Sequence, residues 1–151
     1  MTPRRAEIQR KTKETNVTVT LVLDGTGEAD VASGIRFLDH MLGALARHAG
    51  FDLMLRCAGD LDVDDHHSAE DCALALGAAL DQALGERRGI ARFGSAHAPL
   101  DEALARAVVD LSGRPFAAVA LGLRRERLGD IACVDGYLDE VAGLGLPTHR
   151  I

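Results

Sequence analysis

The pattern of apolar and polar positions predicts alternating strands and helices in the first half of the chain. Residues 17–23 are β-branched or apolar, and the turn-forming residues of 24–27 (DGTG) follow them, which predicts a strand and then a hairpin turn. Between 37 and 49 the apolar residues recur at the spacing of one helix face, and Gly50 is placed to end that helix. A second apolar strand is predicted at 51–57.

A longer helix is predicted at 68–84, where helix-forming residues dominate. Ser68 and Asp71 have the spacing of a capping box at its start, and Gly85 follows as a stop signal. The first half therefore has the predicted order β-β-α-β-α.

The second half repeats this order in part. A strand is predicted at 104–111, a turn at 112–115, another strand at 116–123 and a helix at 135–145. A constant shift that carries His40 onto Asp135 superposes helix on helix and strand on strand. We therefore expect an internal duplication within a single domain of residues 1–151, with a first repeat at about 8–85 and an incomplete second repeat at about 86–151.

Composition and charge narrow the class of protein. With 47% hydrophobic and 26% charged residues, the 151-residue chain is typical of one soluble globular domain. No apolar run approaches the roughly 20 residues of a membrane span, and the polar N-terminus lacks the apolar core of a secretion signal. The net charge of −6 and the scattered basic residues argue against nucleic-acid binding, so we expect a small-molecule partner. Three widely spaced cysteines (Cys57, Cys72 and Cys133) argue against a disulfide framework and for a reducing cytoplasm.

The densest group of potential metal ligands is the segment 64–71 (DDHHSAED). Imidazole nitrogens and carboxylate oxygens are ligands favoured by Zn, Mn and Fe. On a helix, Glu70 shares a face with either His66 or His67. Because successive helical side chains diverge by about 100°, adjacent histidines serve two ions more naturally than one, which predicts a paired-metal or shared-interface site. The alternative is a polar, solvated helix start, where the helix dipole favours acidic side chains, but paired histidines gain nothing from that dipole.

Three further residues have two interpretations each. His40 lies in an apolar helical stretch. It is either a hydrogen-bonded core residue or an additional metal ligand, with its imidazole ring oriented by Asp39. Arg92 and Arg114 lie beside glycines, which let a phosphate or carboxylate approach the backbone, although a solvated arginine beside a turn has the same pattern.

Eight segments of the chain carry a further signal: RKTKET (10–15), LDGTG (23–27), GIRFLDHML (34–42), RHAGFDL (47–53), GDLDVDDHHSAED (59–71), GIARFG (89–94), PLDEAL (99–104) and VDLSGRP (109–115). Taken in order, they resemble the successive signature segments of the imidazoleglycerol-phosphate dehydratase family. Eight matches in order are far more specific than one motif, and they cover about residues 8–130.

The resemblance implies an α+β fold built from a duplicated βα half of the ribosomal protein S5 domain 2-like type, with sheets layered with helices and the second half incomplete here. It implies Mn²⁺-dependent dehydration of D-erythro-imidazole glycerol phosphate to imidazole acetol phosphate in histidine biosynthesis. It also implies a cytoplasmic homo-oligomer whose active sites form between subunits.

Site residues follow from the matching motif positions. The metal ligands implied by the resemblance are His40, His66, His67 and Glu70. The implied substrate contacts are these four residues together with Glu14, His48, Arg92 and Arg114. The expected catalytic residues are Glu14, His66, His67 and Glu70, with Glu14 as the proton shuttle and the arginines suited to the phosphate.

The chain departs from the family pattern near its end. The family's second half carries its own helix histidine and its own His-His-x-x-Glu cluster, whereas Asp135 stands at the helix position here and the counterpart of His66 would fall about ten residues beyond Ile151. One alternative to an active dehydratase is therefore a truncated, catalytically impaired homologue with partial metal binding. Another is an unrelated histidine-rich metal-binding or hydrolytic protein, but the chain lacks an HExxH motif and such a protein needs none of the Glu14, Arg92 and Arg114 matches.

Overall fold

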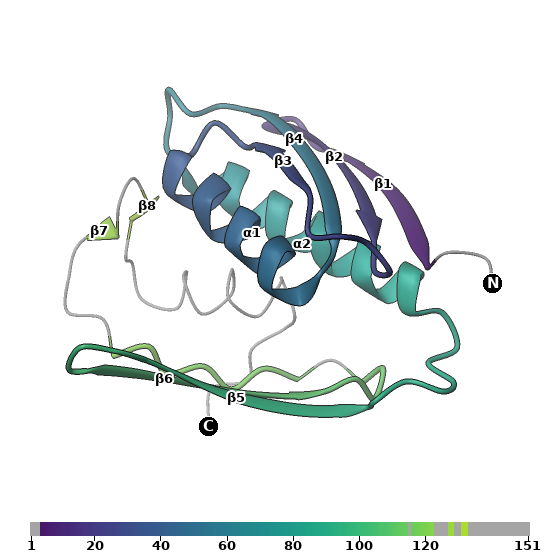
Figure 1. Ribbon diagram of the computed structural model, residues 1–151. Coiled ribbons are helices and arrows are strands. Elements are labelled where there is room, and N and C mark those ends of the chain that lie inside the picture. The colour runs from purple at the N-terminus through teal and green to yellow at the C-terminus, as the bar shows by residue number, and fades with distance from the viewer. Residues whose placement is uncertain (1–3, 115, 123–126, 129–130, 133–151) are drawn as a thin grey trace.

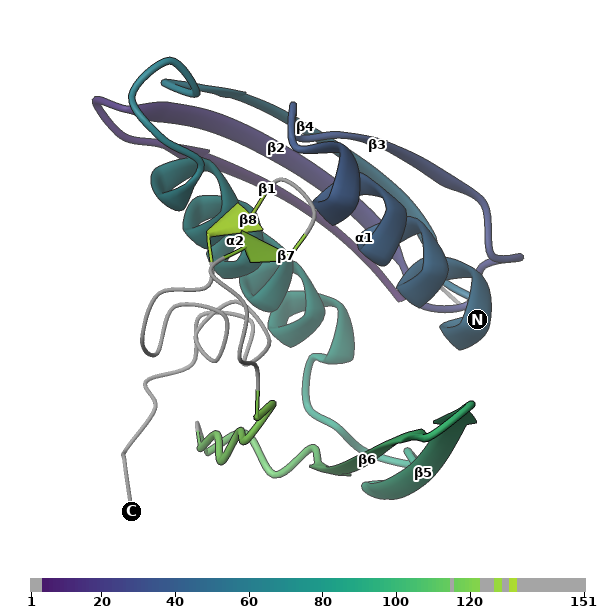
Figure 2. The ribbon, with the colours of Figure 1, turned by 90° about the vertical axis from the view of Figure 1, so that its left-hand side faces the viewer.

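A computed structural model describes residues 4–114, 116–122, 127–128 and 131–132. In chain order its elements are β1 Arg5–Lys11, β2 Thr15–Val22, β3 Ala29–Ala32, α1 Arg36–Ala49, β4 Asp52–Gly59, α2 His66–Leu84, β5 Phe93–Leu100, β6 Ala103–Asp110, β7 Arg127–Leu128 and β8 Ile131–Ala132. The two helices cover one face of a four-stranded sheet, and the β5–β6 hairpin lies on the other side of the helices (Figures 1 and 2). This layered α+β architecture confirms the expected fold class.

The strand order of the main sheet is β1-β2-β4-β3. β2 pairs antiparallel with β1 and β4, whereas β3 pairs parallel with β4. The prediction of a hairpin turn at 24–27 is therefore wrong, because the strands on either side of it are separated by β4. Residues 24–28 instead cross the start of β4. There, Asp52 Oδ1 accepts hydrogen bonds from the backbone N–H of Thr26 (2.7 Å) and of Glu28 (3.2 Å).

The hydrophobic core lies between the sheet and the two helices. Strands β2 and β4 alternate, so that Val17, Val19 and Leu21 on one strand and Leu53 and Leu55 on the other are buried against the helices. This period of two is the one expected of a sheet with a single buried face. The packing of α1 and α2 against this apolar face of the sheet stabilises both helices.

Helix α1 agrees with its prediction to within one residue. It ends at Gly50, which adopts a left-handed φ of 73° and donates its N–H to the carbonyl of Ala46, as a C-terminal glycine cap does. Helix α2 begins at His66, two residues before the predicted start, and ends before Gly85 as predicted. None of the described helices is long and apolar enough to cross a membrane.

The predicted capping box at the start of α2 is wrong. Asp65 occupies the N-cap without a side-chain cap hydrogen bond. Asp71 turns toward the sheet, where its carboxylate accepts a hydrogen bond from the buried hydroxyl of Thr15. A tertiary partner has therefore taken the side chain that the local pattern assigned to the helix end.

The second half agrees with its predictions in part. Strand β6 is found close to the predicted range 104–111, but its partner β5 was not predicted. Residues 116–122 form no strand beyond a single bridging residue, Ala117, because an apolar segment becomes a strand only where a neighbour pairs with it. The predicted helix at 135–145 lies outside the described residues, and the proposed division into two repeats stays a prediction.

Replacing Asp52 by alanine is expected to lower the stability of the protein at pH 7 but hardly at all at low pH. The N–H of Thr26, and then that of Glu28, lowers the pKa of Asp52 against the opposing effect of desolvation. A carboxyl whose pKa is lower in the folded state stabilises the fold above its unfolded pKa of about 4, and this stabilisation is lost as the pH falls through the folded value. Thermal unfolding of the Asp52→Ala and wild-type proteins between pH 7 and pH 3 measures the difference. The exposed Glu102→Ala provides the control, and a deficit that stays constant over this range would contradict the role of the charge.

Candidate functional site

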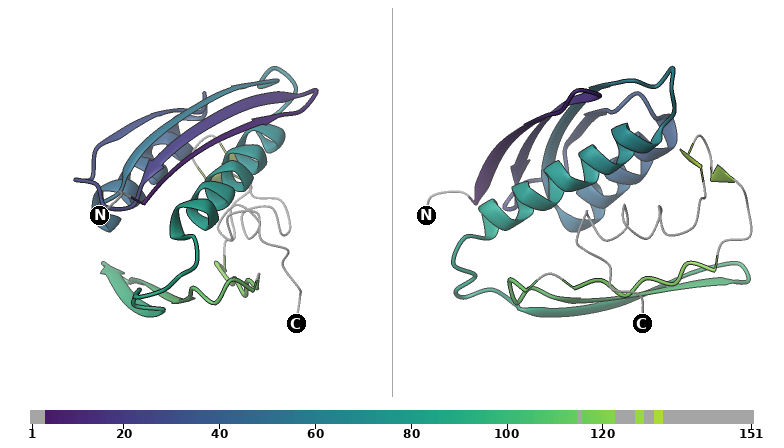
Figure 3. Two further views of the ribbon diagram at one scale, coloured as in Figure 1. Left: turned by 90° about the vertical axis from the view of Figure 1, so that its right-hand side faces the viewer. Right: turned by 180° about the vertical axis from the view of Figure 1, so that it is seen from behind.

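The residues of the candidate site gather at one end of the main sheet. Thr15 pairs with Gly59, so the β1–β2 turn that carries Glu14 lies beside the end of β4. The chain then enters α2 at His66, and α1 follows β3, which runs parallel to β4. Both helices therefore begin at this end, as Figures 1 and 3 show, with His40 close to the start of α1.

His66 and His67 point in different directions from the first turn of α2. Their rings are nearly perpendicular, at 79°, with centroids 5.9 Å apart. His66 Nε2 lies 3.9 Å from Glu70 Oε2, as expected for residues one helical turn apart. His67 Nδ1 instead lies 3.1 Å from Asp60 Oδ2. Each histidine is thus paired with a different carboxylate.

Asp60 is a site residue that the sequence reasoning did not single out. Its hydrogen bond raises the pKa of His67 above the ordinary value, and the negative charges of Asp64 and Glu14 act in the same direction against the effect of desolvation. Because Thr15 pairs with Gly59, the β1–β2 turn that carries Glu14 lies next to Asp60, the residue that holds His67. A signal was available, because a metal-binding histidine usually donates its other ring N–H to a carboxylate.

The donor atoms present fit part of the coordination shell of two ions. Two ligands each about 2.1 Å from one ion can be at most about 4.2 Å apart, so the 3.9 Å between His66 Nε2 and Glu70 Oε2 is compatible with one shared ion. His67, held at Nδ1 by Asp60, has its Nε2 as the ligand atom for another ion. Within the described part of the chain, no three His, Cys, Asp or Glu side chains meet closely enough to enclose an ion.

His40 is exposed, which contradicts the interpretation as a core histidine. Asp39 was expected to orient its ring, but Asp39 Oδ1 accepts hydrogen bonds from the backbone N–H (2.8 Å) and the hydroxyl (2.6 Å) of Ser33. Asp39 therefore holds the entry into α1, and His40 faces solvent near the start of that helix.

His48 does not lie with the other site residues. It is exposed in the last turn of α1, and the rise of a helix places it about 12 Å along the axis from His40. A single copy of the chain thus presents these two histidines at opposite ends of one helix.

Arg92 directly precedes β5, whose first residue Phe93 pairs with Asp110 at the open end of the β5–β6 hairpin, and Arg114 follows β6 by four residues. The hairpin itself lies on the side of the helices away from the main sheet (Figure 2). Arg92 donates from Nε and Nη2 to the two carboxylate oxygens of Asp110, at 2.6 and 2.9 Å, and its guanidinium lies 4.8 Å from the centre of the Phe93 ring. The hydrogen bond from Arg92, and the charges of Arg92 and Arg114, lower the pKa of Asp110. Asp110 is thus held by Arg92, while Arg114 acts on the same carboxylate only through its charge.

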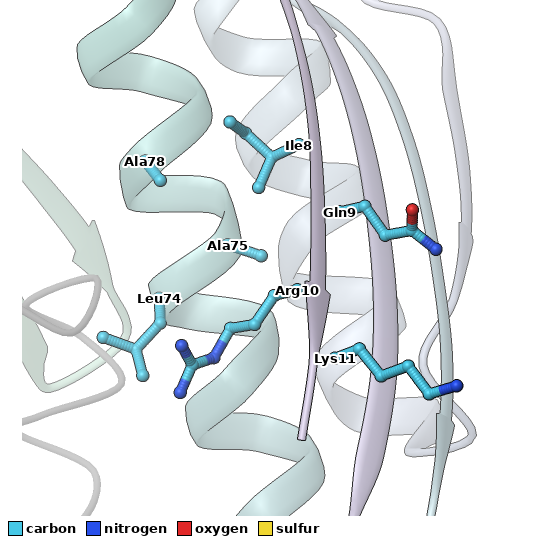
Figure 4. Close-up of a pocket in the computed structure, with 7 residues that line it drawn as sticks. All are labelled: Ile8, Gln9, Arg10, Lys11, Leu74, Ala75 and Ala78. Atoms are coloured by element: carbon cyan, nitrogen blue, oxygen red, sulfur yellow. The ribbon is translucent and has the colours of Figure 1, made fainter.

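A groove of about 410 Å³ lies elsewhere, between the edge strand β1 and helix α2 (Figure 4). It is lined by residues 8–11 of β1 and by Leu74, Ala75 and Ala78 of α2. None of these residues belongs to the predicted site. The histidine cluster at the sheet end is a partly exposed group of side chains, separate from this groove.

Comparison with known proteins identifies relatives of one kind. A family model described as imidazoleglycerol-phosphate dehydratase matches residues 33–137. The imidazoleglycerol-phosphate dehydratase of Cereibacter sphaeroides is 56% identical over 126 residues, which are 83% of this chain and 65% of that protein. That of Phytophthora nicotianae is 54% identical over 150 residues, or 98% of this chain and 33% of that protein. The chain thus spans between one third and about two thirds of the length of these two relatives.

Solved structures with the same fold carry the same name. The crystal structure of imidazoleglycerol-phosphate dehydratase from Staphylococcus aureus superposes with a TM-score of 0.75 at 29% identity, covering 94% of this chain and 77% of that one. The enzyme from Pyrococcus furiosus gives a TM-score of 0.73 at 33% identity, covering 91% and 72%. The likeness extends over nearly the whole chain.

Proposed function

Because the chain belongs to the imidazoleglycerol-phosphate dehydratase family, we propose that it carries out the Mn²⁺-dependent dehydration of imidazole glycerol phosphate to imidazole acetol phosphate, a step of histidine biosynthesis in the cytoplasm. The observation that carries this proposal is the divergence of the two histidines at the start of α2: His66 lies beside Glu70, whereas Asp60 holds Nδ1 of His67 and leaves its Nε2 for a different ion. Such a pair suits two ions that hold one imidazole ring between them.

Four residues would hold the metal. His66 and Glu70 would share one ion, His67 would present Nε2 to another, and His40 would add a ligand from the start of α1. When bound, Mn²⁺ would act as a Lewis acid that stabilises negative charge on the substrate ring while hydroxide leaves. The remaining coordination positions call for ligands beyond these four.

We place the complete site between subunits of a homo-oligomer. No three ligands enclose an ion within the described part of the chain, and the histidine cluster is partly exposed at the sheet end. His48 lies about 12 Å along α1 from His40, so it would contact substrate in a site other than the one His40 completes. Ligands from a second subunit would complete each ion's shell.

The chain's own residues would bind the phosphate and move the proton. Glu14 lies on an exposed turn with its charge close enough to raise the pKa of His67, which suits a proton shuttle at the edge of the metal site. Arg92 and Arg114 would bind the phosphate, which would displace Asp110 from the bidentate contact with Arg92.

The test compares two proteins in an assay for imidazole acetol phosphate with Mn²⁺. A polypeptide of these 151 residues contains one His-His-x-x-Glu cluster. We expect its turnover to be orders of magnitude below that of the Cereibacter relative, because half of the expected metal ligands are not on it. A chimera in which the relative's second cluster follows residue 151 should form product. A chimera that assembles and binds Mn²⁺ but makes no imidazole acetol phosphate would overturn the proposed function.

A further inference from the structure

Asp71 follows the proposed ligand Glu70 but points into the protein. It is 5% exposed, and its carboxylate accepts hydrogen bonds from three side chains of β1, β2 and the turn between them. The donors are Arg10 Nε at 2.6 Å, the hydroxyl of Thr12 at 3.4 Å and the hydroxyl of Thr15. One side chain of α2 thus holds both ends of the β1–β2 turn.

The same network reaches the backbone of Glu14. The hydroxyl oxygen of Thr12 accepts the N–H of Glu14 at 3.2 Å and the N–H of Thr15 at 2.9 Å. The backbone N–H of Thr12 donates in turn to the carbonyl of Thr15 at 2.9 Å. The conformation of the turn that carries Glu14 is therefore tied to Thr12, and Thr12 is tied to Asp71.

A carboxylate at position 71 sets the direction of every hydrogen bond in this network. Because it only accepts, both threonine hydroxyls must donate toward it. The lone pairs of Thr12 are then free for the two backbone N–H groups of the turn. An amide at this position would donate on one side, so either Arg10 or Thr15 would face a second donor or the threonine network would reverse.

Helix geometry connects this anchor to the metal cluster. Asp71 lies one helical turn after His67, so the anchor and the histidine share one face of α2. Glu14 precedes Thr15, which pairs with Gly59, and the next residue, Asp60, lies 3.1 Å from His67 Nδ1, so the turn that carries Glu14 is next to the segment that holds this histidine. We propose that Asp71 is a positioning residue, which anchors the β1–β2 turn to α2 and thereby holds Glu14 beside His67. This inference rests on the proposed role of Glu14 as the proton shuttle.

The experiment compares Asp71→Asn, Glu14→Gln and the double variant. The variants are made in the 151-residue polypeptide or in the chimera described above, whichever shows dehydratase turnover. We expect Asp71→Asn to lower kcat by roughly 10- to 100-fold, because a catalytic group displaced by about 1 Å costs up to about that much. Its Mn²⁺ affinity and KM should change less than threefold. Amide exchange at Glu14 and Thr15 should become faster. In the double variant kcat should fall no further than in Glu14→Gln alone.

Asp81→Asn is the matched control, since Asp81 is an exposed acid of the same helix that pairs with Arg87 instead. If Asp71→Asn does not fold, Thr12→Val and Thr12→Ser replace it. Thr12→Val, which removes the hydroxyl, should lower kcat as expected for Asp71→Asn. Thr12→Ser keeps the hydroxyl and should have a kcat close to that of the wild type.

The outcomes separate the inference from the function on which it rests. Wild-type kcat in Glu14→Gln would overturn the role of Glu14, and the positioning role with it. An impaired Glu14→Gln together with unchanged kcat and amide exchange in Asp71→Asn would overturn the positioning role alone. Fully additive losses of kcat in the double variant would also overturn it, because a merely structural role acts independently of Glu14.

Discussion

Replacing both His66 and His67 by alanine is expected to remove the proposed Mn²⁺ binding of this chain. In the chimera that adds a second His-His-x-x-Glu cluster, it is expected to lower the proposed dehydratase turnover by about a thousandfold or more. The double variant takes away both histidine ligands of α2, which leaves Glu70 and Asp60 without the partners that lie 3.9 and 3.1 Å from them. A bound metal contributes several kcal/mol of charge stabilisation in the transition state, and each 1.36 kcal/mol is about a factor of ten in rate.

Titration calorimetry with MnCl₂ and the product assay measure the two effects. His97→Ala is the matched control, because His97 is an exposed histidine on β5, outside the cluster. Both side chains removed from α2 are partly exposed at the helix start, so the variant should fold and unfold like the wild type. Unchanged Mn²⁺ affinity and stoichiometry in a folded double variant would show that the ion binds elsewhere.

Leu55→Ala is expected to destabilise the protein by about 2–5 kcal/mol, the usual cost of emptying a fully buried leucine site. Leu55 has no exposed surface and lies in the middle of β4, beneath both helices. The loss combines the transfer free energy of the removed atoms with the cavity that remains. Urea denaturation followed by circular dichroism gives the free energy of unfolding.

The neighbouring residue on the same strand is the control. Met54 points to the opposite face of the sheet and is 41% exposed, so Met54→Ala should cost less than about 1 kcal/mol. Equal losses from Leu55→Ala and Met54→Ala would mean that both faces of the sheet are covered, contrary to the layering described.

The elements that were predicted well are those whose signal is local. Helix α1 presents Leu38, Leu42 and Ala46 to the core at helical spacing, and a glycine ends each helix. Strand β1 was missed because its alternation runs through long charged residues at a sheet edge. With only Ala6 and Ile8 as apolar residues, β1 has too few to indicate a strand without its partner. The strand that the predicted order places between the turn at 24–27 and the first helix is found as β3, but it pairs with β4 and not with β2.

The sequence by itself determined the two helices, the central strands β2 and β4 and the presence of paired histidines with a carboxylate one turn away, because periodicity and spacing act within a few residues. The tertiary structure decided that β4 lies between β2 and β3, that Asp60 holds His67, and that Asp71 anchors the turn of Glu14 instead of capping α2. These three facts depend on pairings between residues far apart in the chain, or on which of several competing partners a carboxylate accepts from. Packing of the whole domain selects among those partners, and no local pattern encodes that choice.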